Sequence, residues 1–242
     1  MPAHPALLVG DDEHAFGTMA ARVFTALLAQ YERPLVTLPT GMTPRGFYDS
    51  LVTHDAHRRA LWDALRFVAL DEYMGLPPGD ERLFGAWLAR ACLDPLDIRQ
   101  RRMFDSAGDP QDEVARMDLW LRQNGPIDIA VLGLGANGHI AFNEPGTAFD
   151  TGVHVTALTD DTIRSNARYW GGAARVPRQG ITLGLHDLAQ ARHTILLVNG
   201  AGKADMLAQA LNGPVTADMP ASYLQTIENV TVVADRDAAA KL

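Results

Sequence analysis

A short apolar run recurs along this chain, each time followed by a glycine-rich or polar cluster and then by a helical pattern. Four of these runs cover residues 34–38, 65–70, 127–132 and 194–198, and a fifth run without such a cluster covers 230–233. Continuous apolar runs of about five residues are typical of strands buried on both faces, as they are in a parallel sheet. This recurrence limits the fold more strongly than any other feature of the sequence.

The segments between the runs have the periodicity of amphipathic helices, at residues 13–30, 45–52, 83–91, 112–123 and 203–211. Strands that alternate with helices predict βαβ units joined by right-handed crossovers. We therefore predict an α/β fold, with one Rossmann-like domain over residues 1–242 and a mainly parallel sheet flanked by helices. Residues 150–178, which are rich in Thr, Asp, Arg and Gly, are expected to form a poorly packed excursion that acts as a lid.

The polar clusters at the ends of the four runs are the candidate site. They cover residues 39–44, 71–73, 133–139 and 199–203. In open α/β sheets, ligands bind beyond the carboxyl ends of the strands. Because all four clusters follow the carboxyl end of a run, we expect them to converge on one ligand.

His139 lies in a glycine-rich turn, with Asn137 two residues before it and Glu144 five residues after it. A histidine can move a proton in either direction near neutral pH, and a nearby carboxylate fixes its tautomer. A histidine that only caps a turn is the alternative. The same turn contains a literal G-x-G-x-x-G, but Pro145-Gly146 interrupts too early for the helix of a dinucleotide site.

Asp71-Glu72 follows a mostly apolar run and is either a solvated pair or a carboxylate whose basicity rises in a partly desolvated cleft. The cluster at 39–44 can present backbone N–H groups and the hydroxyls of Thr40 and Thr43 to an anion. Lys203 stands at a predicted helix start, where a cation opposes the helix dipole unless an anion is near. These two threonines, with Lys203 and Arg168, can form a small cationic site.

The composition limits the partners of the protein. The formal net charge is −8, which argues against nucleic acid or an anionic membrane as a partner. The single cysteine excludes an intrachain disulfide and fits the reducing cytoplasm, and the amino-terminal residues 1–10 do not read as a signal peptide. His54 and His57 have no third ligand in their neighbourhood, so no metal site is expected.

Two motifs resemble the signatures of the glucosamine-6-phosphate deaminases: LDEYMGL at residues 70–76 and GHIAFNEP at 138–145. The resemblance extends in order over nearly the whole chain. It implies a cofactor-free conversion of glucosamine 6-phosphate to fructose 6-phosphate and ammonia. A lactonase acting on 6-phosphogluconolactone, or a deaminase of galactosamine 6-phosphate, is the alternative.

The resemblance also implies roles for individual residues. Asp71 would be the base at C2, and His139 would open the sugar ring. Glu144 and Asn137 would hold the histidine, and the phosphate would be bound by Thr40, Gly41, Thr43, Arg168 and Lys203.

Three departures from the family pattern bear on the site. Asn137 stands where one branch of the family has Asp, so His139 would depend on Glu144 for an electrostatic partner. Met42 replaces a small residue of the phosphate loop, which is unfavourable if its φ is positive. Leu83-Phe84 replaces a Ser-Tyr pair, which can change the preferred sugar. The length of the chain matches the short branch of the family, for which we expect a monomer or small homo-oligomer with weak or no allosteric control.

Overall fold

The computed structural model describes residues 5–242, which form two sheets and the helices around them. The larger, seven-stranded sheet has the order β1-β10-β9-β6-β2-β3-β5, and every pairing in it is parallel. Its strands, in chain order, are β1 (Ala6–Gly10), β2 (Leu35–Thr37), β3 (Arg66–Val68), β5 (Gln100–Arg102), β6 (Ile129–Gly133), β9 (His193–Val198) and β10 (Val230–Asp235). The predicted α/β fold with a mainly parallel sheet is confirmed.

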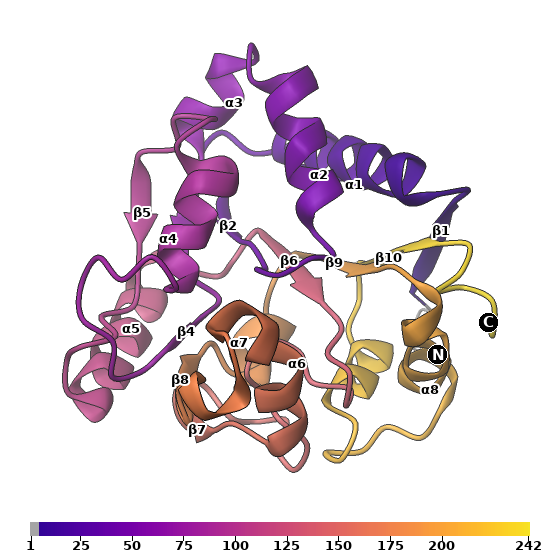
Figure 1. Cartoon of the computed structure of the whole chain (residues 1–242). Helices are drawn as coiled ribbons and strands as arrows, with labels where there is room; N and C mark the ends of the chain where they lie inside the picture. The colour runs from indigo at the N-terminus through magenta and orange to yellow at the C-terminus, as the bar shows by residue number, and fades with distance from the viewer. Residues whose placement is uncertain (1–4) are drawn as a thin grey trace.

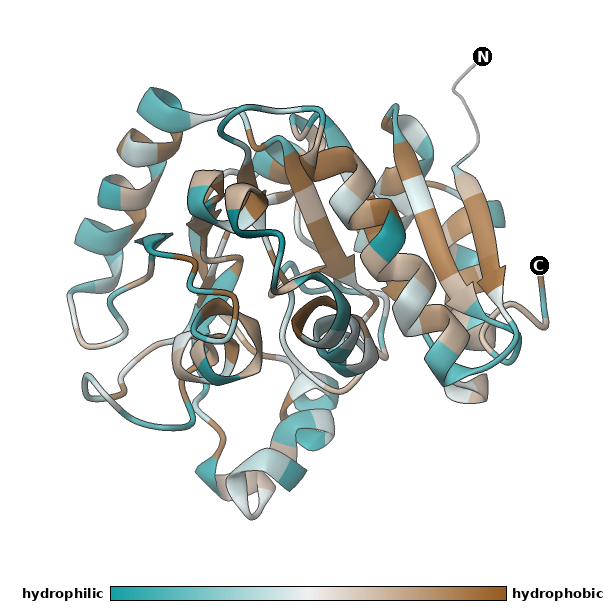
Figure 2. Ribbon diagram, turned by 90° about the horizontal axis from the view of Figure 1, so that it is seen from above, coloured by the Kyte–Doolittle hydropathy of each residue, from teal (hydrophilic) through white to brown (hydrophobic). Residues whose placement is uncertain are grey.

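Figure 1 shows α1 and α2 on one side of this sheet and α8 on the other. Figure 2 shows that the strands are largely apolar, while many hydrophilic residues lie on the helices and loops around them. The α-helices are α1 (Glu13–Leu28), α2 (Arg45–Ser50), α3 (Arg59–Ala64), α4 (Phe84–Leu88), α5 (Pro110–Asn124), α6 (Asp160–Trp170), α7 (Leu185–Ala189) and α8 (Ala204–Asn212). Two π-helical turns, η1 (Leu51–Asp55) and η2 (Ala89–Leu93), extend α2 and α4, and three 3₁₀ turns are η3 (Ala173–Arg175), η4 (Ala201–Lys203) and η5 (Pro220–Thr226). Within residues 5–242, none of the helices combines the length and the apolar character needed to cross a bilayer.

The sequence analysis missed the edge strand β1. Its residues Leu7, Leu8 and Val9 are exposed. The prediction covered strands that are buried on both faces, and β1 is not such a strand. Residues 1–4 of the segment expected not to be a signal peptide lie outside the described residues.

A second correction concerns residues 65–73. The predicted run 65–70 is only partly a strand, because the chain leaves the parallel sheet after Val68. Asp71, predicted as part of a polar cluster after that strand, is instead the first residue of β4 (Asp71–Tyr73). This strand belongs to a three-stranded antiparallel sheet with β8 (Gln179–Thr182) and β7 (His154–Ala157).

The excursion at 150–178 is better packed than expected. It contains β7, α6 and η3, and a small second core buries Ile163 and Trp170 against Tyr73 and Phe142. Thr159 caps α6, since its hydroxyl accepts the Thr162 N–H. The segment is therefore a folded part of the cleft wall, and its motion as a lid remains a prediction.

The described residues form one large hydrophobic core around the parallel sheet, with the small core beside it. That residues 1–242 fold as one domain remains a prediction. For the function, the important result is that β9, β6, β2 and β3 are neighbours, because their following segments then reach the same end of the sheet.

Candidate active site

The segments that follow these four strands line one cleft of about 430 Å³. Thr40, Gly41 and Thr43 come from the loop after β2, and Asp71 from β4, which follows β3. His139 comes from the turn after β6, and Lys203 from η4 after β9. Arg168 of α6 also lines the cleft, whereas Asn137 and Glu144 lie behind His139. The structure thus brings the predicted site residues together.

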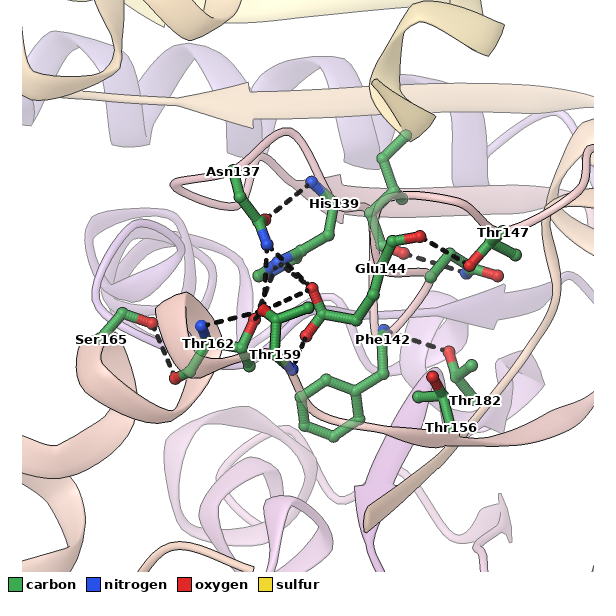
Figure 3. Close-up of polar contacts among 12 residues, drawn as sticks. Asn137, His139, Phe142, Glu144, Thr147, Thr156, Thr159, Thr162, Ser165 and Thr182 are labelled. Carbon is green, nitrogen blue, oxygen red and sulfur yellow. Dashed lines mark hydrogen bonds and ion pairs between the residues drawn. The ribbon is translucent and has the colours of Figure 1, made fainter. Parts of the chain in front are cut away.

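Glu144 is the centre of a polar network around His139 (Figure 3). Its Oε2 lies 3.5 Å from His139 Nδ1 and accepts a hydrogen bond from Asn137 Nδ2 at 2.9 Å. Thr159 donates to the same carboxylate through its backbone N–H at 3.2 Å and its hydroxyl at 3.1 Å. Burial alone would raise the pKa of Glu144, but the hydrogen bonds and charge of His139, with further hydrogen bonds, lower the pKa to about 2. Glu144 is therefore an anion that orients His139.

The turn itself places the imidazole. The backbone N–H of Gly135 donates to the His139 carbonyl, and the His139 ring lies so close to Gly135 that a Cβ there would stand 2.3 Å from it. Thr162 Oγ1 lies 3.3 Å from His139 Nδ1, the same nitrogen that faces Glu144. Because these contacts occupy Nδ1, the other ring nitrogen is left to exchange a proton with a ligand.

No helix follows the G-x-G-x-x-G turn before β7, over a segment that is described throughout. The turn instead serves to position His139. Two of its glycines have a local role: Gly138 has a φ of 86°, and Gly135 leaves room for the His139 ring.

Asp71 lies in a very different environment. Burial raises the pKa of its carboxyl well above the usual value, and the neighbouring charge of Glu72 raises it further. The rings of Tyr73 and Phe84 pack against each other at a tilt, with centroids 4.7 Å apart, and both residues line the cleft with Asp71. A carboxylate in such surroundings is a stronger base than one in water.

Two cations stand on another part of the cleft wall. Lys203 Nζ donates to the Leu134 carbonyl at 2.7 Å, and the Arg168 guanidinium donates to the Tyr169 hydroxyl at 2.9 Å. Neither is paired with a carboxylate anywhere in residues 5–242. Burial lowers the pKa of Lys203, and the positive charge of Arg168 lowers it further. Two cations that repel each other beside a cleft form a site for an anion.

The loop after β2 completes this wall. Tyr48 of α2 donates to the Pro39 carbonyl at 2.6 Å, which anchors the loop to the helix that follows it. The positive φ of the loop is at Gly41, at 106°, and Met42 does not have one. The predicted conflict at Met42 is therefore absent, and this exposed residue lines the cleft.

The sequence analysis did not identify several residues of the site. Thr159 and Thr162 contact the His139 network, and Trp170 and Arg82 line the cleft. The Thr-Asp-Asp-Thr pattern at 159–162 is a recognisable helix start and could have revealed Thr159. The aromatic wall has no comparable local signal, because its members come from separate segments.

Comparison with known proteins agrees with this geometry. The pattern of the family described as glucosamine-6-phosphate isomerases/6-phosphogluconolactonase matches residues 12–233. The chain belongs to this family.

Curated members of the family cover almost the whole chain. A glucosamine-6-phosphate deaminase of Halalkalibacterium halodurans is 37% identical over 233 residues, which are 94% of this chain and 95% of that protein. A glucosamine-6-phosphate deaminase of Leuconostoc citreum is 40% identical over 85% of this chain and 86% of its own.

Solved structures of the family share the fold. A monomeric glucosamine-6-phosphate deaminase superposes with a TM-score of 0.94 at 30% identity, covering 98% of this chain and all of the other. The 6-phosphogluconolactonase of Trypanosoma brucei superposes with a TM-score of 0.79 at 22% identity, covering 99% of this chain and all of the other. The latter similarity concerns the fold alone.

Proposed function

We propose that this protein is an enzyme that converts glucosamine 6-phosphate to fructose 6-phosphate and ammonium. The observation that carries the proposal is the cleft itself. It combines a carboxylate of raised pKa, a histidine oriented by an ionised glutamate, and two cations that lack carboxylate partners. The names of the family members that match the whole chain support the same reaction.

In this proposal the phosphate binds between Arg168, Lys203 and the loop of Thr40, Gly41 and Thr43. The binding energy of a phosphate far from the reacting carbons positions C1 and C2 at the other side of the cleft. Charge-assisted hydrogen bonds from Arg and Lys suit a phosphate dianion.

His139 then moves a proton at the ring oxygen, so that the pyranose opens to the aldehyde. Its Nδ1 lies 3.5 Å from Glu144 Oε2, and this contact keeps the ring in place. Asn137 does not line the cleft. It donates a hydrogen bond to Glu144 and so supports the carboxylate that orients His139.

Asp71 takes the proton from C2 and returns it to C1. The electron pair of the C2–H bond forms an enolamine, and protonation at C1 gives an imine at C2. Water hydrolyses the imine to the ketone, releasing ammonium. A carboxylate with a raised pKa suits both directions of this transfer, since it removes a proton more readily and still gives it back.

The test is to incubate the purified protein with glucosamine 6-phosphate, without added cofactor, and to measure ammonium and fructose 6-phosphate. Equal amounts of the two products are expected. The absence of turnover, together with rapid hydrolysis of 6-phosphogluconolactone, would overturn the proposal. Galactosamine 6-phosphate serves as a parallel substrate, because Phe84, which departs from the Ser-Tyr pair of the family pattern, lines the cleft.

The monomer or small homo-oligomer expected from the sequence, and the location in the cytoplasm, stay predictions. Gel filtration with light scattering tests the first. A cell fractionation experiment tests the second.

A further inference from the structure

Glu72 is a buried carboxylate to which the proposed reaction assigns no role. It is 4% exposed and does not line the cleft, whereas its neighbours on β4, Asp71 and Tyr73, do. Side chains of a strand alternate between its two faces, so Glu72 points behind the cleft wall.

Three backbone N–H groups hold this carboxylate. Oε1 accepts hydrogen bonds from Tyr73 and Phe84, and Oε2 accepts one from Gly85, each at 2.9 Å. Phe84 and Gly85 begin α4, so Glu72 ties this part of the cleft wall to the strand that carries Asp71.

No cation neutralises Glu72. Within residues 5–242, no Lys, Arg or His lies within ion-pair distance of Glu72 or Asp71. The elements packed against β4 are β8 and α4, and neither contains an ionisable side chain. Outside these elements, the charged groups near Glu72 are Asp80 and its ion-pair partner Arg82, in the segment before α4.

The two adjacent carboxylates therefore have unequal surroundings. Glu72 accepts three N–H groups, whereas the Asp71 carboxylate accepts no hydrogen bond from the described chain. Two neighbouring carboxylates do not ionise independently, and the one with more donors keeps the first negative charge. Burial raises the pKa of Glu72 to about 7, even though the N–H groups of Gly85, Phe84 and Tyr73 act in the opposite direction.

We propose that Glu72 is a positioning residue for Asp71: a buried carboxylate that fixes the cleft wall to β4 and determines how readily Asp71 takes up a proton. The proposal rests on the proposed function, in which Asp71 is the base at C2. Glu72 acts on the reaction only through Asp71 and the wall, without touching the substrate.

The decisive variant is Glu72→Gln, which removes the charge and keeps the size of the side chain. The titration of Asp71 is followed by carboxyl NMR on protein labelled with ¹³C-aspartate, and the Asp71 signal is assigned by its loss in Asp71→Asn. We expect the Asp71 midpoint to fall by about one pH unit or more in Glu72→Gln. The acidic limb of kcat for glucosamine 6-phosphate should move to lower pH by the same amount.

Asp128→Asn is the matched control. Asp128 is also a buried carboxylate that accepts a backbone N–H, from Leu35 at 2.8 Å. Unlike Glu72 it pairs with a cation, Arg192, at 3.1 Å, and it lies at the opposite, amino end of the strands. This variant should lose stability without moving the Asp71 midpoint. A loss of activity in Glu72→Gln with an unchanged Asp71 midpoint overturns the proposal, because a purely structural role would give that result.

A second measurement covers the case in which Glu72→Gln does not fold. Coupling between two sites is reciprocal, so neutralising Asp71 in Asp71→Asn must lower the midpoint of Glu72 by a similar amount. ¹³C-glutamate labelling measures this midpoint, and equal values in the wild type and Asp71→Asn overturn the proposal. Both titrations are independent of turnover, so a wild type that releases no ammonium refutes the proposed function and leaves the test of Glu72 intact.

Discussion

The two carboxylates beside the cleft, Asp71 and Glu144, are of the same chemical type but lie in opposite environments. Glu144 is surrounded by donors from Asn137, Thr159 and His139, and its pKa falls to about 2. Asp71 stands on a strand beside aromatic rings and a second carboxylate, and its pKa rises. Their difference shows that the hydrogen bonds and charge of His139, with the other donors, outweigh burial at Glu144, whereas burial dominates at Asp71.

The variant with the largest expected effect on activity is Asp71→Asn, which tests the contrast between Asp71 and Glu144. If Asp71 is the base, the variant should lose about 10³-fold or more in kcat, because an amide cannot accept the C2 proton. Binding of the substrate should persist, and exchange of the C2 proton with deuterium should stop, as followed by NMR. If the C2 proton exchanged at the normal rate in this variant, another residue would be the base, and Asp71 would no longer contrast with Glu144 in function.

The counterpart is Glu144→Gln. The variant keeps the shape of the network but loses its charge, so kcat should fall by about 10²-fold through a misoriented His139. The steady-state kinetics of Glu144→Gln and Asn137→Ala can be compared. Of His139, Asn137 contacts only the backbone N–H, at 3.3 Å, and its side-chain amide donates to Glu144, so its variant should show the smaller loss. An equal loss in both would mean that Asn137 has a role of its own.

The pH dependence of stability should run in opposite directions for the two regions. The pKa of Glu144 falls from 4.5 to about 2 on folding, so its contribution to stability is present above pH 4.5 and is lost as the pH falls through about 2. The pKa of Glu72 rises from 4.5 to about 7, so its contribution is present below pH 4.5 and is lost as the pH rises through about 7.

Urea unfolding of the wild type, Glu144→Gln and Glu72→Gln across pH 3 to 8 measures both effects. Relative to its Gln variant, the wild type should lose stability toward low pH for Glu144 and toward high pH for Glu72. If the stability difference changed with pH in the same direction for both variants, the assignment of opposite environments to Glu144 and Glu72 would be wrong.

Arg168 and Lys203 differ from the two carboxylates, because they should affect substrate binding and not proton transfer. Arg168→Ala and Lys203→Met should each raise KM about 10-fold or more, since a charge-assisted contact to phosphate is lost. The pH profile of kcat should stay as in the wild type. An unchanged KM would remove these residues from the phosphate site.

The smallest effect is expected for Phe84→Tyr. Phe84 packs against Tyr73 and Phe142, with ring centroids 4.7 and 5.5 Å away, and the added hydroxyl changes the cleft wall without moving a charge. Its kcat for glucosamine 6-phosphate should change by less than about threefold, while the ratio of glucosamine to galactosamine 6-phosphate turnover tests its role in sugar choice. A shift in the pH profile of kcat in this variant would show that the side chain at position 84 itself changes the pKa of Asp71.

Much of the fold could be predicted because burial of a parallel strand leaves a local signal. The runs that became β2, β6, β9 and β10 are continuous and apolar, and the polar clusters after them are visible in the sequence. The edge strand β1 and the antiparallel β7 and β8 were missed, since they are exposed, short or mixed in polarity. The local pair His139 and Glu144 was found because Glu144 follows His139 by only five positions.

The sequence by itself therefore determined the fold class, the strands that supply the cleft and the residue types available at each strand end. Only the tertiary structure decided that the chain changes sheets after Val68, so that β4 pairs with β8 and Glu72 meets the start of α4. It also placed Arg168 and Lys203 near one another, from segments that have no pattern in common. The physical reason is that the pKa of a carboxylate or an amine depends on the burial, donors and charges around it. Distant segments contribute these, and no local pattern contains them.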